Sequence, residues 1–239
     1  MNRFLTVTFL LFAIILKATG GSPSLPHVWK FIYAQEHEIE KSGDKTNQLK
    51  IQRQCLASAS MQTLNATPAN QLEDVFGKLS AAMYFVGENG SMSDVPILLP
   101  FAEIQLPSSW PGVGDIPVTP GPPPAPASDI EKRRVPACYA LSKILMRSPD
   151  RVTNLVADSA TNETLSATAT LRILGVLIDV DSIMAPGYAE LIRNRFKSKQ
   201  VNEVIADLET RKTRYWMVNL ELNKVTSTNA PARDGKIGK

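Results

Sequence analysis

The feature that most constrains the fold is a proline-rich stretch in the middle of the chain. Ten of the seventeen prolines lie between Gly87 and Ala127, and the stretch ends in the run PGPPPAP at residues 120–126. Proline lacks a backbone N–H and disfavours helix at the residue before it, so a helix or a central strand is not expected here. We predict a proline-rich extended segment over residues 88–127, whose last part adopts the polyproline II conformation.

The first part of this segment is too apolar for a free linker. Residues 95–106 read VPILLPFAEIQL, which contains only one charged side chain. We expect these residues to lie along the surface of a helical body and to cover an apolar groove. A role as a proline-rich ligand for a partner is less favoured, since that mode of recognition belongs mostly to cytosolic signalling.

Amphipathic patterns on both sides of the proline-rich segment predict a mainly α protein. The clearest helix covers residues 67–86, with Thr67 as N-cap, Pro68 at the first helical position, and apolar residues at three- and four-residue spacing until Gly87 ends it. Similar patterns predict helices over residues 28–42, 44–64 and 188–208, on either side of Pro136, and after Ser148.

Two segments leave a minor β content open, near residues 172–180 and 215–222. The length of the apolar segment 162–184 favours a buried helix, although ILGVLIDV at 173–180 also fits a core strand. Apolar residues alternate over 216–222 as they do in a strand, whereas the charged residues of 209–212 favour a continued helix.

The amino terminus has the three parts of a secretory signal peptide. Arg3 precedes an apolar run from Phe4 to Leu16, and small residues follow up to Gly20. As a helix this run rises roughly 20 Å, less than the bilayer core of about 30 Å, so a cleaved signal is favoured over a membrane anchor. We predict cleavage after Gly20 and a periplasmic or secreted mature chain without stable membrane insertion.

Cys55 and Cys138 are the only cysteines. In an oxidising compartment two cysteines allow a single pairing, which predicts a disulfide; two buried free thiols are the alternative. Such a bridge would be worth roughly 4–5 kcal/mol on the chain-entropy model. It would join residues 21–87 and 128–226 into one composite domain. Residues 88–127 would then be a clamped loop rather than a tether between two domains. We expect residues 227–239 to form a flexible tail.

Composition argues against several classes of function. A net charge of +3 and few, scattered aromatic residues are not typical of a nucleic-acid binder. The only histidines, His27 and His37, are ten residues apart and outside any H-E-x-x-H motif, so no metal site is predicted. There is no G-x-S-x-G motif and no glycine-rich phosphate loop. We therefore assign no catalytic or cofactor-binding residue and expect no cofactor.

The composition does not exclude an enzyme that uses two acidic side chains for hydrolysis, and this is the alternative function. Asp179 and Asp181 follow an apolar run and would project from one face of a strand, whereas on a helix they would lie about 200° apart. Glu103, set between apolar neighbours, is the second candidate. An exported hydrolase acting on polysaccharide or cell wall would need two such acids in one cleft.

The favoured function is a non-enzymatic, exported helical structural or interaction protein. Its general form, with a signal peptide, a helical body and few histidines, is similar to that of accessory periplasmic components of bacterial secretion or conjugation machinery, and no motif names a family. Other envelope or secreted proteins are the expected partners. A carrier with an apolar pocket between its helices is a third hypothesis. Asn65, Asn89 and Asn162 begin N-x-S/T sequons.

Overall fold

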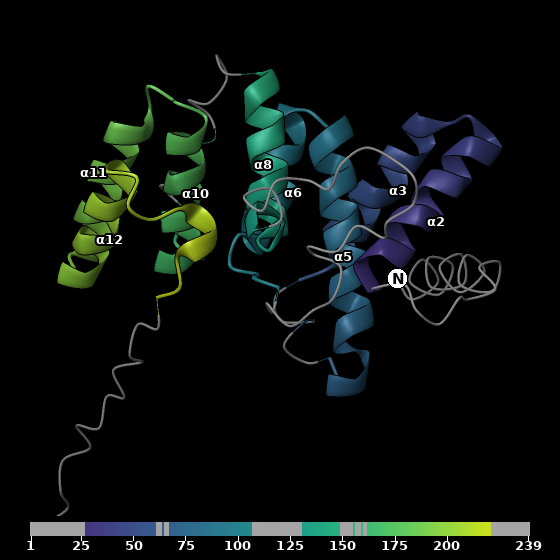
Figure 1. The fold of residues 1–239 in the computed structure, drawn as a ribbon, viewed down its shortest axis with the longest axis horizontal. Helices are drawn as coiled ribbons and strands as arrows, with labels where there is room; N and C mark the ends of the chain where they lie inside the picture. The colour runs from purple at the N-terminus through teal and green to yellow at the C-terminus, as the bar shows by residue number, and fades with distance from the viewer. Residues whose placement is uncertain are drawn as a thin grey trace, which may run out of the picture.

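The chain folds into a body of packed helices (Figure 1). The structure, a computed structural model, describes residues 27–60, 64, 67–106, 131–148, 155, 159 and 162–220. Its longer helices are α2 (His27–Ser42), α3 (Lys45–Ser58), α5 (Ala69–Asn89), α8 (Pro136–Arg147), α10 (Ala167–Asp179), α11 (Ala185–Phe196) and α12 (Lys199–Glu209). Four short helical segments are η1 (Met92–Asp94), α6 (Val95–Leu98), η2 (Leu99–Phe101) and η4 (Tyr215–Met217). The prediction of a mainly α protein is confirmed.

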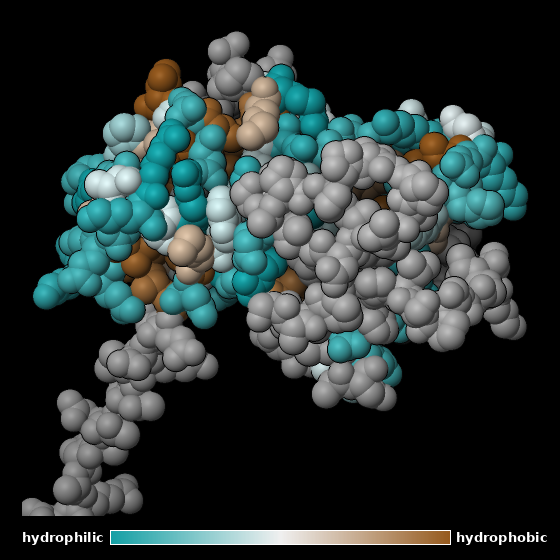
Figure 2. All heavy atoms as spheres, in the orientation of Figure 1, coloured by the Kyte–Doolittle hydropathy of each residue, from teal (hydrophilic) through white to brown (hydrophobic). Residues whose placement is uncertain are grey.

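The helices form two groups around a central pair. Figure 1 places α10, α11 and α12 together at one end of the body and α2 and α3 at the other. Between them, α5 contacts α2, α3 and α8, while α8 contacts α10. Within the described residues, no helix is both long enough and apolar enough to cross a membrane. On the face drawn in Figure 2, hydrophilic residues cover most of the described surface and separate smaller apolar patches.

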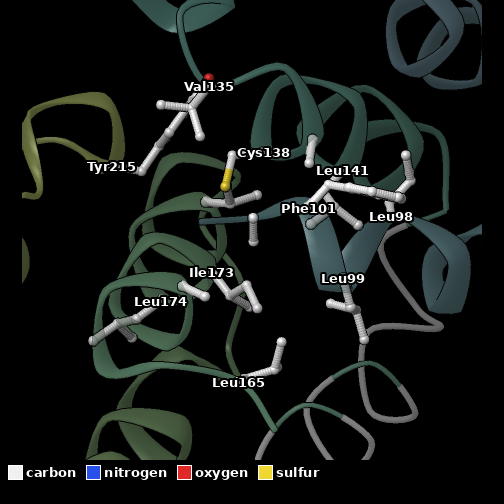
Figure 3. Close-up of a cluster of buried hydrophobic side chains, with 14 of the residues drawn as sticks. Leu98, Leu99, Phe101, Val135, Cys138, Leu141, Leu165, Ile173, Leu174 and Tyr215 are labelled. Carbon is white, nitrogen blue, oxygen red and sulfur yellow. The ribbon is translucent and has the colours of Figure 1, made fainter. Parts of the chain in front are cut away.

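One apolar cluster joins residues of the proline-rich stretch to the helices that follow it (Figure 3). Phe101, Leu141, Ile173 and Tyr215 belong to it, and each is almost fully buried. Residues 167–177 of α10 are all buried, because this helix is apolar around nearly its whole circumference and is covered by α8, α11, α12 and η4.

The expectation of an extended, surface-lying segment from residue 88 is wrong for the part that the structure describes. Residues 92–101 form η1, α6 and η2 in succession. Pro96 and Pro100 occupy first-turn positions of α6 and η2, where the missing backbone N–H costs nothing. Leu98 and Phe101 are buried in the core instead of covering a groove on its surface. Residues 107–127, for which polyproline II was predicted, lie outside the described residues, as do the signal peptide and the tail 227–239.

Gly87 does not end the third helix. α5 continues to Asn89, and Gly90 is its C-cap. Gly87 instead lies where α5 passes α8, and a Cβ atom built on it would be 2.6 Å from the Cα of Ala140. The glycine therefore allows a close helix crossing rather than a stop.

The strand left open near residues 172–180 is not formed. Ser166 caps α10 by accepting a hydrogen bond from the N–H of Ala169, and the helix runs to Asp179. The continued helix favoured after residue 209 is also wrong. α12 ends at Glu209, Arg211 adopts a left-handed conformation, and residues 218–220, which follow η4, are neither helix nor strand. Hydrogen bonds from Arg172 and Thr168 of α10 to backbone carbonyl oxygens hold this last segment in place. They override its local preference for helix or strand.

Cys55 and Cys138 are both free cysteines, so the predicted disulfide is not part of this structure. Cys55 lies on α3 and Cys138 on α8, and α5 packs between these two helices. Figure 3 places the sulfur of Cys138 inside the apolar cluster. Burial raises the pKa of Cys55 to about 11 and that of Cys138 to about 12.

We predict two free thiols per chain. A chain unfolded without reductant should react with two equivalents of a thiol reagent, and the folded chain at neutral pH should react far more slowly because both thiols stay protonated and covered. The raised pKa values favour the fold below pH 9.0, and that contribution is lost as the pH rises through about 11 to 12. A pre-reduced sample is the control; a chain that shows thiols only after reduction would contain the disulfide.

We also predict that Gly87→Ala destabilises the protein. The added methyl group meets the α8 backbone at Ala140, and the overpacking cost of about 1–3 kcal/mol exceeds the helix-propensity gain of up to about 1 kcal/mol. Gly187→Ala is the matched control, because a Cβ atom there meets nothing within 4 Å, and it should leave the urea midpoint unchanged or raise it. Equal midpoints for the two variants would contradict the close crossing.

Candidate functional site

A polar pocket lies where three parts of the chain meet: the central segment (residues 102–106), α10, and the last described segment (residues 218–220). Its volume is about 510 Å³. It is lined by Glu103, Gln105 and Leu106 after η2, by Arg134, by Thr168 and Arg172 of α10, and by Asn219 and Leu220. This size falls within the range of ligand pockets, although a mostly polar lining differs from the usual apolar one. We call it the junction pocket.

Arg172 holds the junction pocket together. Its side chain is almost fully buried, and its Nε and Nη2 atoms donate to the carbonyl oxygen of Val218 at 3.0 and 2.8 Å. Its Nη1 atom donates to the carbonyl oxygens of Ala102 and Glu103, at 3.3 and 2.7 Å. Nη2 also donates to Oε1 of Gln105 at 2.5 Å. All five N–H groups of the guanidinium are thus used inside the protein.

The charge of Arg172 has no carboxylate within salt-bridge distance among the described residues. Carbonyl and amide oxygens solvate it instead. Burial lowers the pKa of Arg172, while the Glu103 carboxylate acts in the opposite direction. Since an arginine side chain stays protonated in proteins, Arg172 places a buried positive charge in the wall of the pocket.

Hydrogen bonds join Leu106 and Arg134, the two residues on either side of residues 107–133. The N–H of Leu106 donates to the carbonyl oxygen of Arg134 at 2.7 Å, and Nε of Arg134 donates back to the carbonyl oxygen of Leu106 at 3.4 Å. Nη1 of Arg134 donates to Glu131 at 3.0 Å. The remaining nitrogen, Nη2, makes no hydrogen bond among the described residues. Two residues that flank residues 107–133 are therefore joined without a disulfide.

Two side chains of the lining have unused hydrogen-bonding capacity. The Glu103 carboxylate and the Asn219 amide are exposed, and neither forms a hydrogen bond within the described part of the chain. Their backbones are nevertheless held. The carbonyl of Glu103 accepts from Arg172, and the carbonyls on either side of Asn219 accept from Arg172 and from the Thr168 hydroxyl. The Glu103 carboxylate and the Asn219 amide are thus available in the pocket, while hydrogen bonds fix the backbone that carries them.

The structure does not bring Asp179 and Asp181 into one cleft. Asp179, the last residue of α10, is bound to Arg214 at 2.7 Å, whereas Asp181 is exposed and paired with Arg211. Neither lines the junction pocket. Glu103, the second carboxylate candidate, does line it. The arrangement expected of a two-carboxylate hydrolase is therefore not formed by these acids.

The other candidate groups lie apart from the junction pocket. His37 is exposed on α2, and no group of three or more potential metal-binding side chains occurs in the described residues. A second pocket, between α2, α3 and α5, has a volume of only about 50 Å³ and a mainly apolar lining, so the apolar-carrier hypothesis gains little from it. Of the sequons, Asn65 lies outside the described residues, Asn89 donates to the carbonyl of Phe85, and Asn162 accepts from Thr164.

Sequence reasoning identified Glu103 and missed Arg134, Arg172 and Asn219. A signal for Arg172 is present, because it is the only charged residue between Glu163 and Asp179. A lone charge in an apolar helix indicates a buried group with internal partners. Arg134 and Asn219 carry no such signal, since both lie in short polar stretches.

Comparison with known proteins gives no match to a family model, to a curated protein or to a solved structure. The function is therefore argued from the geometry of the junction pocket.

We predict that Arg172→Met lowers the free energy of unfolding by at least about 3 kcal/mol, because it leaves three buried carbonyl groups without their charged donor. Arg172→Lys should cost less, since one ammonium group replaces part of these contacts. Arg211→Gln, which breaks an exposed ion pair, is the control and should change stability by less than about 1 kcal/mol. Urea unfolding followed by circular dichroism measures all three; an Arg172→Met variant as stable as Arg211→Gln would contradict the role of Arg172.

Proposed function

We propose that this chain is an exported, non-enzymatic interaction protein that binds another envelope or secreted protein through the junction pocket. The observation that carries the proposal is the make-up of the pocket lining. Its described residues combine unused recognition groups on Glu103, Arg134 and Asn219 with only one side chain able to transfer protons, that of Glu103.

This lining suits recognition better than catalysis. Hydrolysis by carboxylates uses two acids, and nucleophilic catalysis pairs a nucleophile with a base. Arginine keeps its proton, so Arg134 and Arg172 stabilise charge and do not act as bases. The hydroxyl of Thr168 already donates to the carbonyl of Leu220, and among the described residues no histidine, cysteine or second acid lines the pocket beside Glu103.

The frame of the pocket supports binding at low entropic cost. Arg172 joins the backbones of Glu103 and Val218, and the reciprocal bonds of Leu106 and Arg134 hold the opposite side. Groups that are already fixed lose little conformational freedom when a partner docks, which leaves more of the interaction energy for affinity.

Two largely buried carboxylates elsewhere are paired with arginine side chains, which favours the junction pocket as the contact point. Buried Asp94 accepts two hydrogen bonds from Arg53, at 2.5 and 2.7 Å, and Asp179 accepts one from Arg214. These pairs hold the helical body together. Together with the signal peptide predicted over residues 1–20, the arrangement suits an accessory component of a bacterial envelope, secretion or conjugation apparatus.

A site-specific photo-crosslinking experiment tests the proposal. A photoreactive amino acid is introduced at the position of Asn219 in the full chain, expressed in its native cell envelope, and at the position of exposed Lys212 as a control outside the pocket. We expect one adduct of defined mass from the Asn219 position, absent from the Lys212 position and lost when Arg134→Gln is added.

Adducts of equal yield at both positions, or a chain that stays uncrosslinked and elutes as a monomer, would contradict the proposal. Circular dichroism of Arg134→Gln distinguishes lost recognition from a lost fold, because Arg134 also bonds to Leu106.

A further inference from the structure

We propose that the junction pocket recognises an extended polypeptide segment that carries one basic and one acidic side chain. The basic side chain pairs with Glu103, the acidic one with Arg134, and the Asn219 amide bonds to the peptide backbone between them. This inference rests on the proposed function and adds the chemical class of the partner.

Arg134 already forms an ion pair with Glu131 and keeps N–H groups for a second carboxylate. Its Nε and Nη1 atoms are held by Leu106 and Glu131, which orients the guanidinium and leaves the N–H groups of Nη2 for a ligand. Its side chain is 23% exposed, so a ligand can reach it while part of its hydration is already removed. Charge-assisted bonds from a guanidinium fixed in this way are among the stronger polar contacts that proteins make.

The field of Arg172 adds to this preference for an anion. The guanidinium is surrounded by uncharged oxygens and is almost fully buried in the pocket wall, where the low local dielectric weakens its charge less than water would. Arg172 has no N–H left for a ligand, so it acts through its charge alone.

Glu103 supplies the opposite preference in the same pocket. Its backbone carbonyl is bound by Arg172 at 2.7 Å, while its carboxylate is exposed and unpaired within the described residues. A ligand with only negative groups would be repelled by this carboxylate, and a ligand with only positive groups would be repelled by Arg134 and Arg172. A ligand that carries both charges satisfies both sides.

Asn219 explains why a peptide fits better than another ligand of mixed charge. A carboxamide donates and accepts in the same way as a peptide group, and the carbonyls on either side of Asn219 are already bound inside the protein. Leu220, which is partly exposed, adds apolar contact to the lining. The described part of the lining holds no aromatic residue to stack against a sugar ring, so it favours a peptide over a saccharide.

A peptide selection tests this inference. The mature chain is used to select from a library of random hexapeptides that are acetylated at the amino end and amidated at the carboxyl end, so that every charge comes from a side chain. The wild type should enrich peptides with one basic and one acidic residue. Glu103→Gln should lose the preference for the basic residue, and Arg134→Gln the preference for the acidic one, with Kd for a selected peptide at least tenfold higher in each case.

Glu103→Lys provides the sharpest variant, because the Glu103 side chain is exposed and its replacement does not disturb the core. It should reverse the selection toward peptides with acidic residues only. Glu203→Gln and Arg211→Gln, which remove the same charges outside the pocket, are the matched controls and should select as the wild type does.

Three outcomes would overturn the inference: no enrichment, enrichment of uncharged peptides, or an unchanged preference in Glu103→Lys. Binding of free lysine or glutamate as tight as that of the selected peptide would also overturn it, because the ligand would then be a small amino acid. If the Asn219-specific adduct forms in the cell envelope while the peptide selection fails, the interaction function stands and only the peptide assignment is lost. If both fail, the proposed function is lost as well.

Discussion

The buried guanidinium of Arg172 is the contact on which the rest of the structure depends. It binds backbone carbonyls from residues 102–103 and from residue 218, so one side chain of α10 joins the central segment to the last described segment. A buried charge without hydrogen-bond partners is very costly, so these segments are held where they can provide the oxygens. The position of η4 and of the residues after it follows from this requirement and from the packing of buried Tyr215 on α10, and not from their own helix or strand propensity.

The side chains of the junction pocket fall into two groups, one that holds the structure together and one that is available for recognition. Arg172 uses every N–H inside the protein, whereas Glu103, Arg134 and Asn219 keep hydrogen-bonding capacity that faces outward. The reciprocal bonds between Leu106 and Arg134 join the two residues that flank residues 107–133. The sequence suggested that a disulfide would clamp the loop. These hydrogen bonds join its ends instead, at a different place and without a covalent bond.

Much of the helical framework was predictable because helices depend on local patterns. α5 and α10 were expected from apolar spacing and length; the ends of α5 differ from the prediction by only a few residues, whereas α10 is clearly shorter at both ends than the predicted segment 162–184. α6 and η2 were missed because proline was read as a helix breaker, whereas Pro96 and Pro100 stand in first turns, where proline is tolerated. Of the candidate site, only Glu103 was identified in advance. The other acids, Asp179 and Asp181, are each paired with an arginine that is distant in sequence.

The sequence by itself determined the mainly α class and most of the helix positions, because capping and apolar periodicity depend on residues within one or two turns of each other. It also contained the two cysteines but not the distance between them, which depends on α5 packing between α3 and α8. Only the tertiary structure decided that Glu103, Arg134, Arg172 and Asn219 meet in one pocket. The physical reason is that long-range contacts are chosen by core packing and by the hydrogen-bond needs of a buried charge, and neither has a local period that a sequence pattern can reveal.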